Sequence, residues 1–359
     1  MLLPKALCAS LYRSYKILCY PQLSLVFGLF SMSTPMNSVS IKSSVLAFCL
    51  SLWCQVVAAQ SGRAAAPQAP EPPGTIRLAE NLFIDESEVA NIHWLEYLQH
   101  IRLDSSETYY RSQLPDSTVW TALTAAPPTA VAGIPTAIIY FRYPGFRYYP
   151  VVGIGYEQAL AYCKWRSMVV NESVLHSTEF QKKHPELRGY DVTVEYRLPT
   201  EAEWRQAAAG PLGSGHTPAA LVPPSPKARP KPVATRKEPG LDSCLVALQI
   251  PAASAIYRLP YNLRENYYTT ETNQAFECPA KPGQLGLEYV YVNPTNYLGL
   301  YNIIGNAAEM TATKGIAKGG SFQSSMRGLT LESQQRYQGP QSWLGFRCVA
   351  TMRMVRRVE

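Results

Sequence analysis

The chain has 359 residues, 47% of them hydrophobic and 11% aromatic, so it is long enough to bury one substantial core. Its 29 prolines and 22 glycines predict a loop-rich globular domain. The formal net charge is +7, but the excess cations lie before residue 60 and in a proline-rich stretch at 218–239. The remainder is near neutral, which argues against a nucleic-acid partner.

Residues 1–59 have the pattern of a signal peptide. They carry four cations and no acidic residue, and residues 43–59 form an apolar run that ends in Val57-Ala58-Ala59. A start at Met36 would give this signal peptide an ordinary length. A membrane anchor is the alternative, but the run is shorter than the roughly 20 apolar residues of a spanning helix. We therefore expect an exported protein that is not integral to the membrane.

The rest of the chain divides by composition. Residues 60–78 are rich in Ala and Pro, as in a flexible linker, and residues 79–353 form the predicted globular domain. Within that domain, the insertion at 210–240 contains seven prolines and five cations between Pro218 and Pro239. We interpret it as a solvated surface insertion, with docking of an acidic or groove-bearing partner as the alternative.

Three helices are predicted inside the domain. Acidic residues at 85–88 followed by apolar residues at helical spacing predict a helix from about Ser87 to Ile101. A second helix is expected over 156–165, because this segment resembles a helix of the family named in the next paragraph. Thr200 with Glu203 three residues later forms a capping box, which predicts a third helix through Ala209.

Three motifs together resemble the formylglycine-generating enzyme (sulfatase-modifying factor) family. They are Tyr-Arg-Leu-Pro-Thr-Glu-Ala-Glu-Trp at 196–204, Gly-Leu-Tyr-Asn-Ile-Ile-Gly-Asn at 299–306 and Lys-Gly-Gly-Ser-Phe at 318–322. With Leu-Gly-Phe-Arg-Cys at 344–348, the similarity extends over about 84–350. The resemblance implies an α+β fold, a loop-rich variant of the C-type lectin fold with few regular elements.

The family's oxidases bind copper through a cysteine pair that follows the Gly-Gly-Ser-aromatic turn. This chain has Ser324 and Leu329 in that region, and no cysteine anywhere in 279–347. Neither residue is a suitable ligand for monovalent copper, which prefers thiolates. We therefore expect no catalytic residue and no copper. The polar residues left in the altered cleft are Ser324, Ser325, Arg327 and Arg336.

The resemblance also implies one structural calcium site. The family's ligands match Asn302, Gly305, Ala307 and Glu309, through the Asn and Glu side chains and the Gly and Ala carbonyls. Hard oxygen donors of this kind suit calcium. A turn held only by hydrogen bonds is the alternative.

Four cysteines remain after signal cleavage: Cys163, Cys244, Cys278 and Cys348. Four cysteines allow three sets of two disulfides, and four buried thiols are a further alternative. Because some family members join the two matching positions, the resemblance implies a Cys163–Cys348 disulfide, leaving Cys244 and Cys278 as the remaining pair.

Two histidines and one arginine are also considered as site residues. His93 and His100 share a helical face but lack a third ligand, so a satisfied or solvated role is expected. The resemblance places Arg347 in the interior, where Glu201 or Glu203 could be its partner.

These observations predict an exported, catalytically inactive family member that acts as a binding or scaffolding component of a cell-envelope, secretion or gliding assembly. Its expected location is periplasmic or envelope-associated, and its expected partner is a protein. Two alternatives remain open. One is an oxidoreductase-like enzyme with altered chemistry in the same cleft, and the other is a carbohydrate-binding module with a glycan as its ligand.

Overall fold

The computed structural model describes residues 67–120, 140–209, 232, 240–251, 253–259, 261–270, 272, 275–279, 286–293 and 295–358. The chain divides into residues 1–68 and a compact unit of residues 69–359, and only the second is described below. The expected signal peptide and nearly all of the 210–240 insertion lie outside the described residues.

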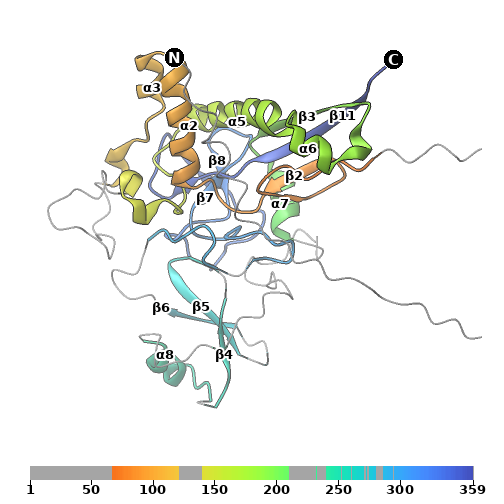
Figure 1. The fold of residues 1–359 in the computed structure, drawn as a ribbon. Helices are drawn as coiled ribbons and strands as arrows, with labels where there is room; N and C mark the ends of the chain where they lie inside the picture. The colour runs from red at the N-terminus through yellow and green to blue at the C-terminus, as the bar shows by residue number, and fades with distance from the viewer. Residues whose placement is uncertain are drawn as a thin grey trace, which may run out of the picture. The chain divides into compact units, whose positions relative to one another are not determined.

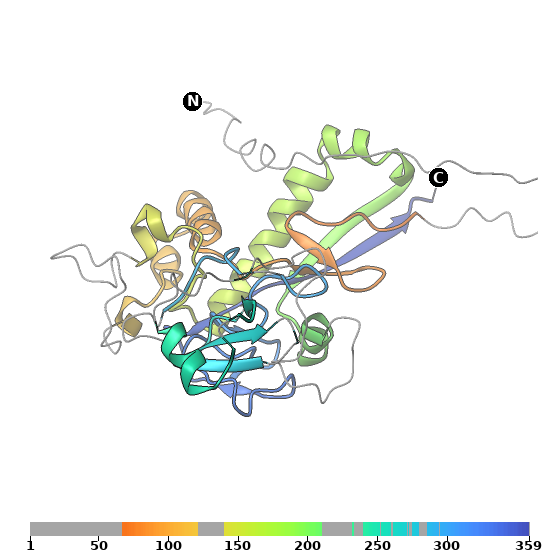
Figure 2. The same cartoon turned by 90° about the horizontal axis from the view of Figure 1, so that it is seen from below.

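The longest sheet joins distant parts of the chain, in the order β1-β2-β11-β3. Strand β11 pairs antiparallel with β2 on one side and with β3 on the other, with Val349 opposite both Ile84 and Arg197. Figure 2 shows β3 and β11 as two long neighbouring strands. The strands are β1 (Thr75–Arg77), β2 (Leu82–Asp85), β3 (Tyr190–Arg197) and β11 (Val349–Arg356).

Two smaller sheets complete the strand structure. One has the order β10-β7-β8-β9, and the other has the order β4-β5-β6. The strands are β4 (Ile256–Arg258), β5 (Glu265–Thr270), β6 (Ala275–Pro279), β7 (Ala308–Met310), β8 (Ile316–Lys318), β9 (Gln335–Arg336) and β10 (Leu344–Gly345). Short strands and long connections agree with the expected α+β, loop-rich fold.

The longer helices pack on the first sheet through an aromatic core. Trp94, Tyr97, Tyr162 and Phe346 bring their rings together, with Trp94 stacked 5.5 Å from Tyr162. Figure 1 shows α5 lying along β3 and β11. The helices are α2 (Asn91–Asp104), α3 (Glu107–Ser112), α5 (Tyr156–Val170), α6 (Thr178–Lys183), α7 (Glu201–Ala209) and α8 (Leu241–Ala247), with short turns at Ser117–Trp120, Pro144–Phe146, Asn171–Leu175 and Pro185–Leu187.

The helix predicted from Ser87 begins four residues later, at Asn91. The residues before it are held in extended backbone, because the Val89 amide donates to the Phe346 carbonyl and the Val151 amide donates to the Val89 carbonyl. Asp85 and Glu88 are buried here and so do not serve as acidic residues of a first helical turn. The helix after Thr200 is confirmed, with the Thr200 hydroxyl and the Glu203 carboxylate each accepting the other's backbone amide.

Side chains of α5 and the turn after it protect the outer edge of β3. The Asn171 side chain bonds both backbone groups of Val194. Its Nδ2 donates to the Val194 carbonyl at 2.8 Å, and its Oδ1 accepts from the Val194 amide at 2.9 Å. Ser167 accepts from the Tyr196 amide at 2.8 Å. An exposed edge strand offers unpaired backbone groups to other chains, so these bonds close part of that edge.

Among the described residues, the structure contains no helix with the length and apolar character needed to cross a bilayer.

Replacing Asn171 tests the protection of the β3 edge. Asn171→Ala should lower the free energy of unfolding by about 1–2 kcal/mol, because both Val194 backbone groups lose their partner. Glu172→Ala, at an exposed neighbouring position, is the control and should change little. Urea unfolding would measure both. Equal stability of the two variants would contradict this role for Asn171.

Candidate functional site

The turn that follows β8 is formed by two glycines and two serines. Gly319 and Gly320 have φ values of 90° and 69°, and a Cβ on Gly319 would lie 2.9 Å from the Ile303 carbonyl oxygen. Only glycine adopts such backbone easily at a close approach. The Ser321 amide then donates to Ser324 Oγ at 3.0 Å, and the Ser324 amide donates to the Ser321 carbonyl. The turn is therefore fixed by its own hydrogen bonds.

The β5–β6 hairpin lies against this turn. The Arg264 amide donates to the Ser324 carbonyl at 3.0 Å, and the Met326 amide donates to the Tyr267 hydroxyl at 2.9 Å. Arg327 forms an ion pair with Glu277 of β6. Met326 and Leu329 are buried in an apolar cluster that includes Leu259, Tyr261, Leu263 and Tyr267. Leu329, one of the two residues in the region where the resemblance implies a cysteine pair, is thus part of the core packing.

The cleft residues predicted from the sequence are only partly brought together. Ser324, Ser325 and Arg327 share the turn, whereas Arg336 is exposed on β9, paired with Ile316 of β8. The Glu265 carboxylate hydrogen-bonds to Ser325. Burial raises the pKa of Glu265, but bonds from Arg264, Tyr267 and Ser325 outweigh this and lower it overall. A carboxylate of lowered pKa is a weak base for activating a serine.

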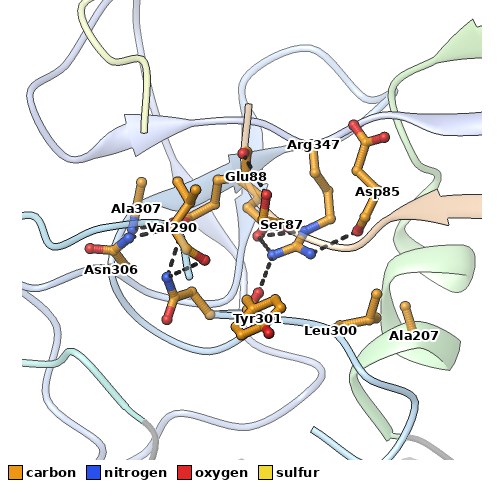
Figure 3. A network of polar contacts seen from close by, with 12 residues as sticks. Asp85, Ser87, Glu88, Ala207, Val290, Leu300, Tyr301, Asn306, Ala307 and Arg347 are labelled. Atoms are coloured by element: carbon orange, nitrogen blue, oxygen red, sulfur yellow. Dashed lines mark hydrogen bonds and ion pairs between the residues drawn. The ribbon is translucent and has the colours of Figure 1, made fainter. Parts of the chain in front are cut away.

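A buried ion pair lies beneath the turn. Arg347 is fully buried, and its Nε and Nη2 donate to Glu309 Oε1 at 2.7 and 2.6 Å. The other oxygen of Glu309 accepts from the Trp204 indole at 2.8 Å. The expected partners of Arg347 were wrong, because Glu203 binds Arg197 and Glu201 accepts from Gln334. Arg347 also donates to the Asp85 and Tyr301 carbonyls, so one guanidinium joins three segments (Figure 3).

Glu88 is a second buried carboxylate, which the sequence interpretation missed. Its Oε2 accepts from the side-chain amides of Asn306, at 2.9 Å, and Asn302, at 3.2 Å, and its Oε1 accepts from the Ala307 amide at 3.0 Å. Figure 3 shows Glu88 beside Asn306 and Ala307. Burial and the neighbouring Glu309 raise the pKa of Glu88 to about 8, opposed by Arg347 and the N–H donors. The apolar residues Val89 and Ala90, which follow Glu88 directly, are the feature of the sequence that could have indicated its burial.

A shallow pocket of about 370 Å³ lies elsewhere on the described surface. Three tyrosines and a valine line it: Tyr148, Tyr289, Tyr291 and Val292. The Tyr289 hydroxyl donates to the Gly145 carbonyl, and its ring lies 4.7 Å from that of Tyr149. The Tyr291 ring meets that of Tyr301 edge to face. Two of the tyrosine rings are therefore held in place by their neighbours.

A model of the sulfatase-modifying factor enzyme 1-like domain matches residues 54–352. The chain belongs to this family. The match includes the Arg347–Glu309 pair, the Glu88 network and the serine turn. No curated protein matches the chain.

Several solved structures are similar to this family member. Treponema denticola variable protein 1 is 15% identical, with 79% of this chain and 92% of that chain covered and a TM-score of 0.37. CarF is 18% identical, with 75% and 86% covered and a TM-score of 0.35. PvdO from Pseudomonas aeruginosa is 13% identical, with 77% and 82% covered and a TM-score of 0.36.

The two side chains that match the family's calcium ligands are hydrogen-bonded to other groups in this geometry. Both oxygens of Glu309 are taken, by Arg347 and Trp204. Asn302 directs its Nδ2 toward Glu88 and the Tyr289 and Val290 carbonyls, while its Oδ1 accepts from Asn293. The alternative amide orientation would oppose oxygens to oxygens. A calcium ion needs six to eight oxygen ligands. In this geometry the Glu309 oxygens and Asn302 Oδ1 accept N–H groups, and Asn302 Nδ2 donates.

The cysteines also differ from the expected arrangement. Cys163 and Cys348 are buried free thiols with sulfur atoms 3.5 Å apart, whereas a disulfide requires about 2.05 Å. The Cys163–Cys348 bond implied by the resemblance is therefore not formed in this structure, although α5 and the approach to β11 place the two thiols side by side. The disulfide among the described residues joins Cys244 of α8 to Cys278 of β6.

Neither histidine of α2 is placed to bind a metal with a third ligand. His93 Nδ1 accepts from the Ala90 amide at the start of the helix, and His100 lies 3.5 Å from Asp104. In the described part of the chain, no group of three or more His, Cys, Asp or Glu side chains could hold a metal ion. Burial and the nearby Arg166 lower the pKa of His93 to about 4.

His93 should make stability depend on pH. Its pKa is about 6.5 in the unfolded chain and about 4 in the fold, so the unfolded state binds more protons between these values. Stability is therefore expected to fall as the pH drops from 6.5 toward 4. His93→Gln keeps an acceptor for the Ala90 amide without the titration and should reduce that slope, as urea midpoints across this pH range would show. His100→Gln is the control, and equal slopes for both variants and wild type would contradict the assignment.

Proposed function

We propose that this chain is an exported, catalytically inactive member of the sulfatase-modifying factor family. In this proposal it acts as a binding or scaffolding component of a cell-envelope, secretion or gliding assembly. The observation that supports it best is the serine turn packed under the β5–β6 hairpin. Ser324 stays partly exposed, but the hairpin binds its carbonyl and would restrict the approach of a substrate from that side.

The chemistry of the turn supports the same proposal. The interval 279–347 contains no cysteine, so no register of the chain places a thiolate here. The Ser324 hydroxyl is already the acceptor of the Ser321 amide, and Glu265, which hydrogen-bonds to Ser325, is a weak base. An oxidoreductase-like reaction in this cleft would need a cofactor for which these residues offer no soft ligand.

An oxidation assay tests the proposed inactivity. Purified full-length chain, supplied with monovalent copper, oxygen and a cysteine peptide of the sulfatase type, should form no aldehyde detectable by mass spectrometry. The double variant Ser324→Cys with Leu329→Cys restores two thiols but leaves the hairpin in place, and it should also be inactive. Aldehyde formed by the wild type would refute the proposal, and aldehyde formed only by the double variant would refute the hairpin as a barrier.

Cell fractionation tests the proposed location. The protein should be recovered with the periplasm or envelope of its native cells, after removal of residues 1–59, as the N-terminal sequence of the purified protein would show. Recovery in the cytoplasm with an intact N-terminus would refute export.

The tyrosine pocket favours carbohydrate binding as a second candidate function. Aromatic rings present flat apolar faces on which the C–H face of a sugar ring can stack, and two of these rings are fixed by neighbours. A volume of about 370 Å³ lies within the range of ligand pockets. Tyr289→Ala should abolish any glycan-array signal of the wild type, while Tyr109→Ala, at an exposed tyrosine outside the pocket, should keep it. A wild type without any signal would refute this candidate.

A further inference from the structure

We infer that the buried carboxylate of Glu88 performs within this chain the bridging role that the family resemblance assigns to calcium. The inference goes beyond the proposed function and does not depend on it. It starts from the geometry of the Asn302–Glu309 segment, in which the two side chains expected to bind calcium are already engaged by other groups.

Glu88 joins three points of that segment at once. Its two oxygens accept from Asn302, Asn306 and the Ala307 amide, at 2.9–3.2 Å. The backbone between these points is tightly curved, because Asn302, Gly305 and Asn306 have φ values of 46°, 84° and 62°. Left-handed backbone at two non-glycine residues is costly and persists only where surrounding contacts determine it. Glu88 supplies such contacts from the distant segment after β2.

The bridge extends to a second loop. Asn302 Nδ2 also lies 3.3 and 3.2 Å from the carbonyl oxygens of Tyr289 and Val290. Asn306 Oδ1 accepts from the Glu288 amide at 2.8 Å, and its Nδ2 donates to the Glu288 carbonyl. The loop at 286–293 is thus attached to Glu88 through two asparagine side chains. This loop carries three of the four residues that line the tyrosine pocket.

The charges around the segment fit an internal bridge. Arg347 already places one cation against Glu309, with both side chains buried. A calcium ion bound by Glu309 would lie beside that guanidinium and would have to displace at least one of its hydrogen bonds. Glu88, in contrast, has no cation within its hydrogen-bond set in the described part of the chain, and its two oxygens accept N–H groups that have no other carboxylate among their hydrogen-bond partners.

Thermal unfolding with and without calcium tests the inference on the unmodified chain. Wild-type protein should have the same Tm in millimolar calcium chloride and in excess chelator. Glu88→Ala should lower the Tm by about 5 °C or more in both conditions, because the buried Ala307 amide loses its acceptor and the Asn302 and Asn306 side chains each lose one of theirs. Glu195→Ala, an exposed carboxylate on β3, is the matched control and should leave the Tm unchanged.

Hydrogen exchange distinguishes a local bridge from general stability. Amides of residues 286–293 should lose protection in Glu88→Ala while those of β3 and β11 keep it, and Glu88→Gln should lose less because its amide oxygen remains an acceptor. A wild-type Tm that rises by several degrees with calcium would overturn the inference. Unchanged protection of 286–293 in Glu88→Ala would also overturn it. If Glu88→Ala does not fold, the inference is still tested by the wild-type comparison with and without calcium and by hydrogen exchange of Glu88→Gln.

Discussion

The ion pair between Arg347 and Glu309 is the interaction on which the rest of the domain depends. It lies at zero to one per cent exposure, and Arg347 binds the end of β2 and the loop at Tyr301 as well as β7. Removing either partner would leave an uncompensated buried charge, which typically costs about 3–5 kcal/mol. Because Trp204 of α7 donates to the same carboxylate, the pair also fixes the helix that begins with the capping box.

Lys318 is a buried cation that lacks such a set of partners. It lies opposite Glu309 in the register of β7 and β8 and is 1% exposed, yet its ammonium has no hydrogen-bond partner within the described structure. Its nearest carboxylate oxygen, on Glu201, is 4.0 Å away, and the Trp204 ring lies below it at 5.5 Å. Burial lowers the pKa of Lys318, as expected where a charge is poorly compensated. The difference from Arg347 lies in geometry, since a planar guanidinium reaches several acceptors at once.

The sequence predicted what depends on local chemistry. The capping box at Thr200, the α+β class and the family follow from short motifs whose residues interact with near neighbours or recur in relatives. Partners across the fold could not be predicted in the same way. Arg347 was placed in the interior, but its partner Glu309 lies 38 residues away, and nothing in the sequence separates it from the more distant Glu201 and Glu203. Glu88 was interpreted as part of the first turn of a helix, because acidic residues before an apolar run are typical of helix N-termini. The sequence pattern is the same whether such a residue is solvated or buried beneath a distant loop.

The β5–β6 hairpin determines the surroundings of the serine turn. It is tied to α8 by the Cys244–Cys278 disulfide, and it contacts the turn through the Ser324 carbonyl and the Met326 amide. Apolar packing around Met326 and Leu329 fills the space beside these contacts. Glu88 and its asparagine partners hold the loop at 286–293, whose tyrosines are exposed. The exposed face of that loop is therefore free to vary, whereas the core beneath it is constrained by polar groups that must stay hydrogen-bonded.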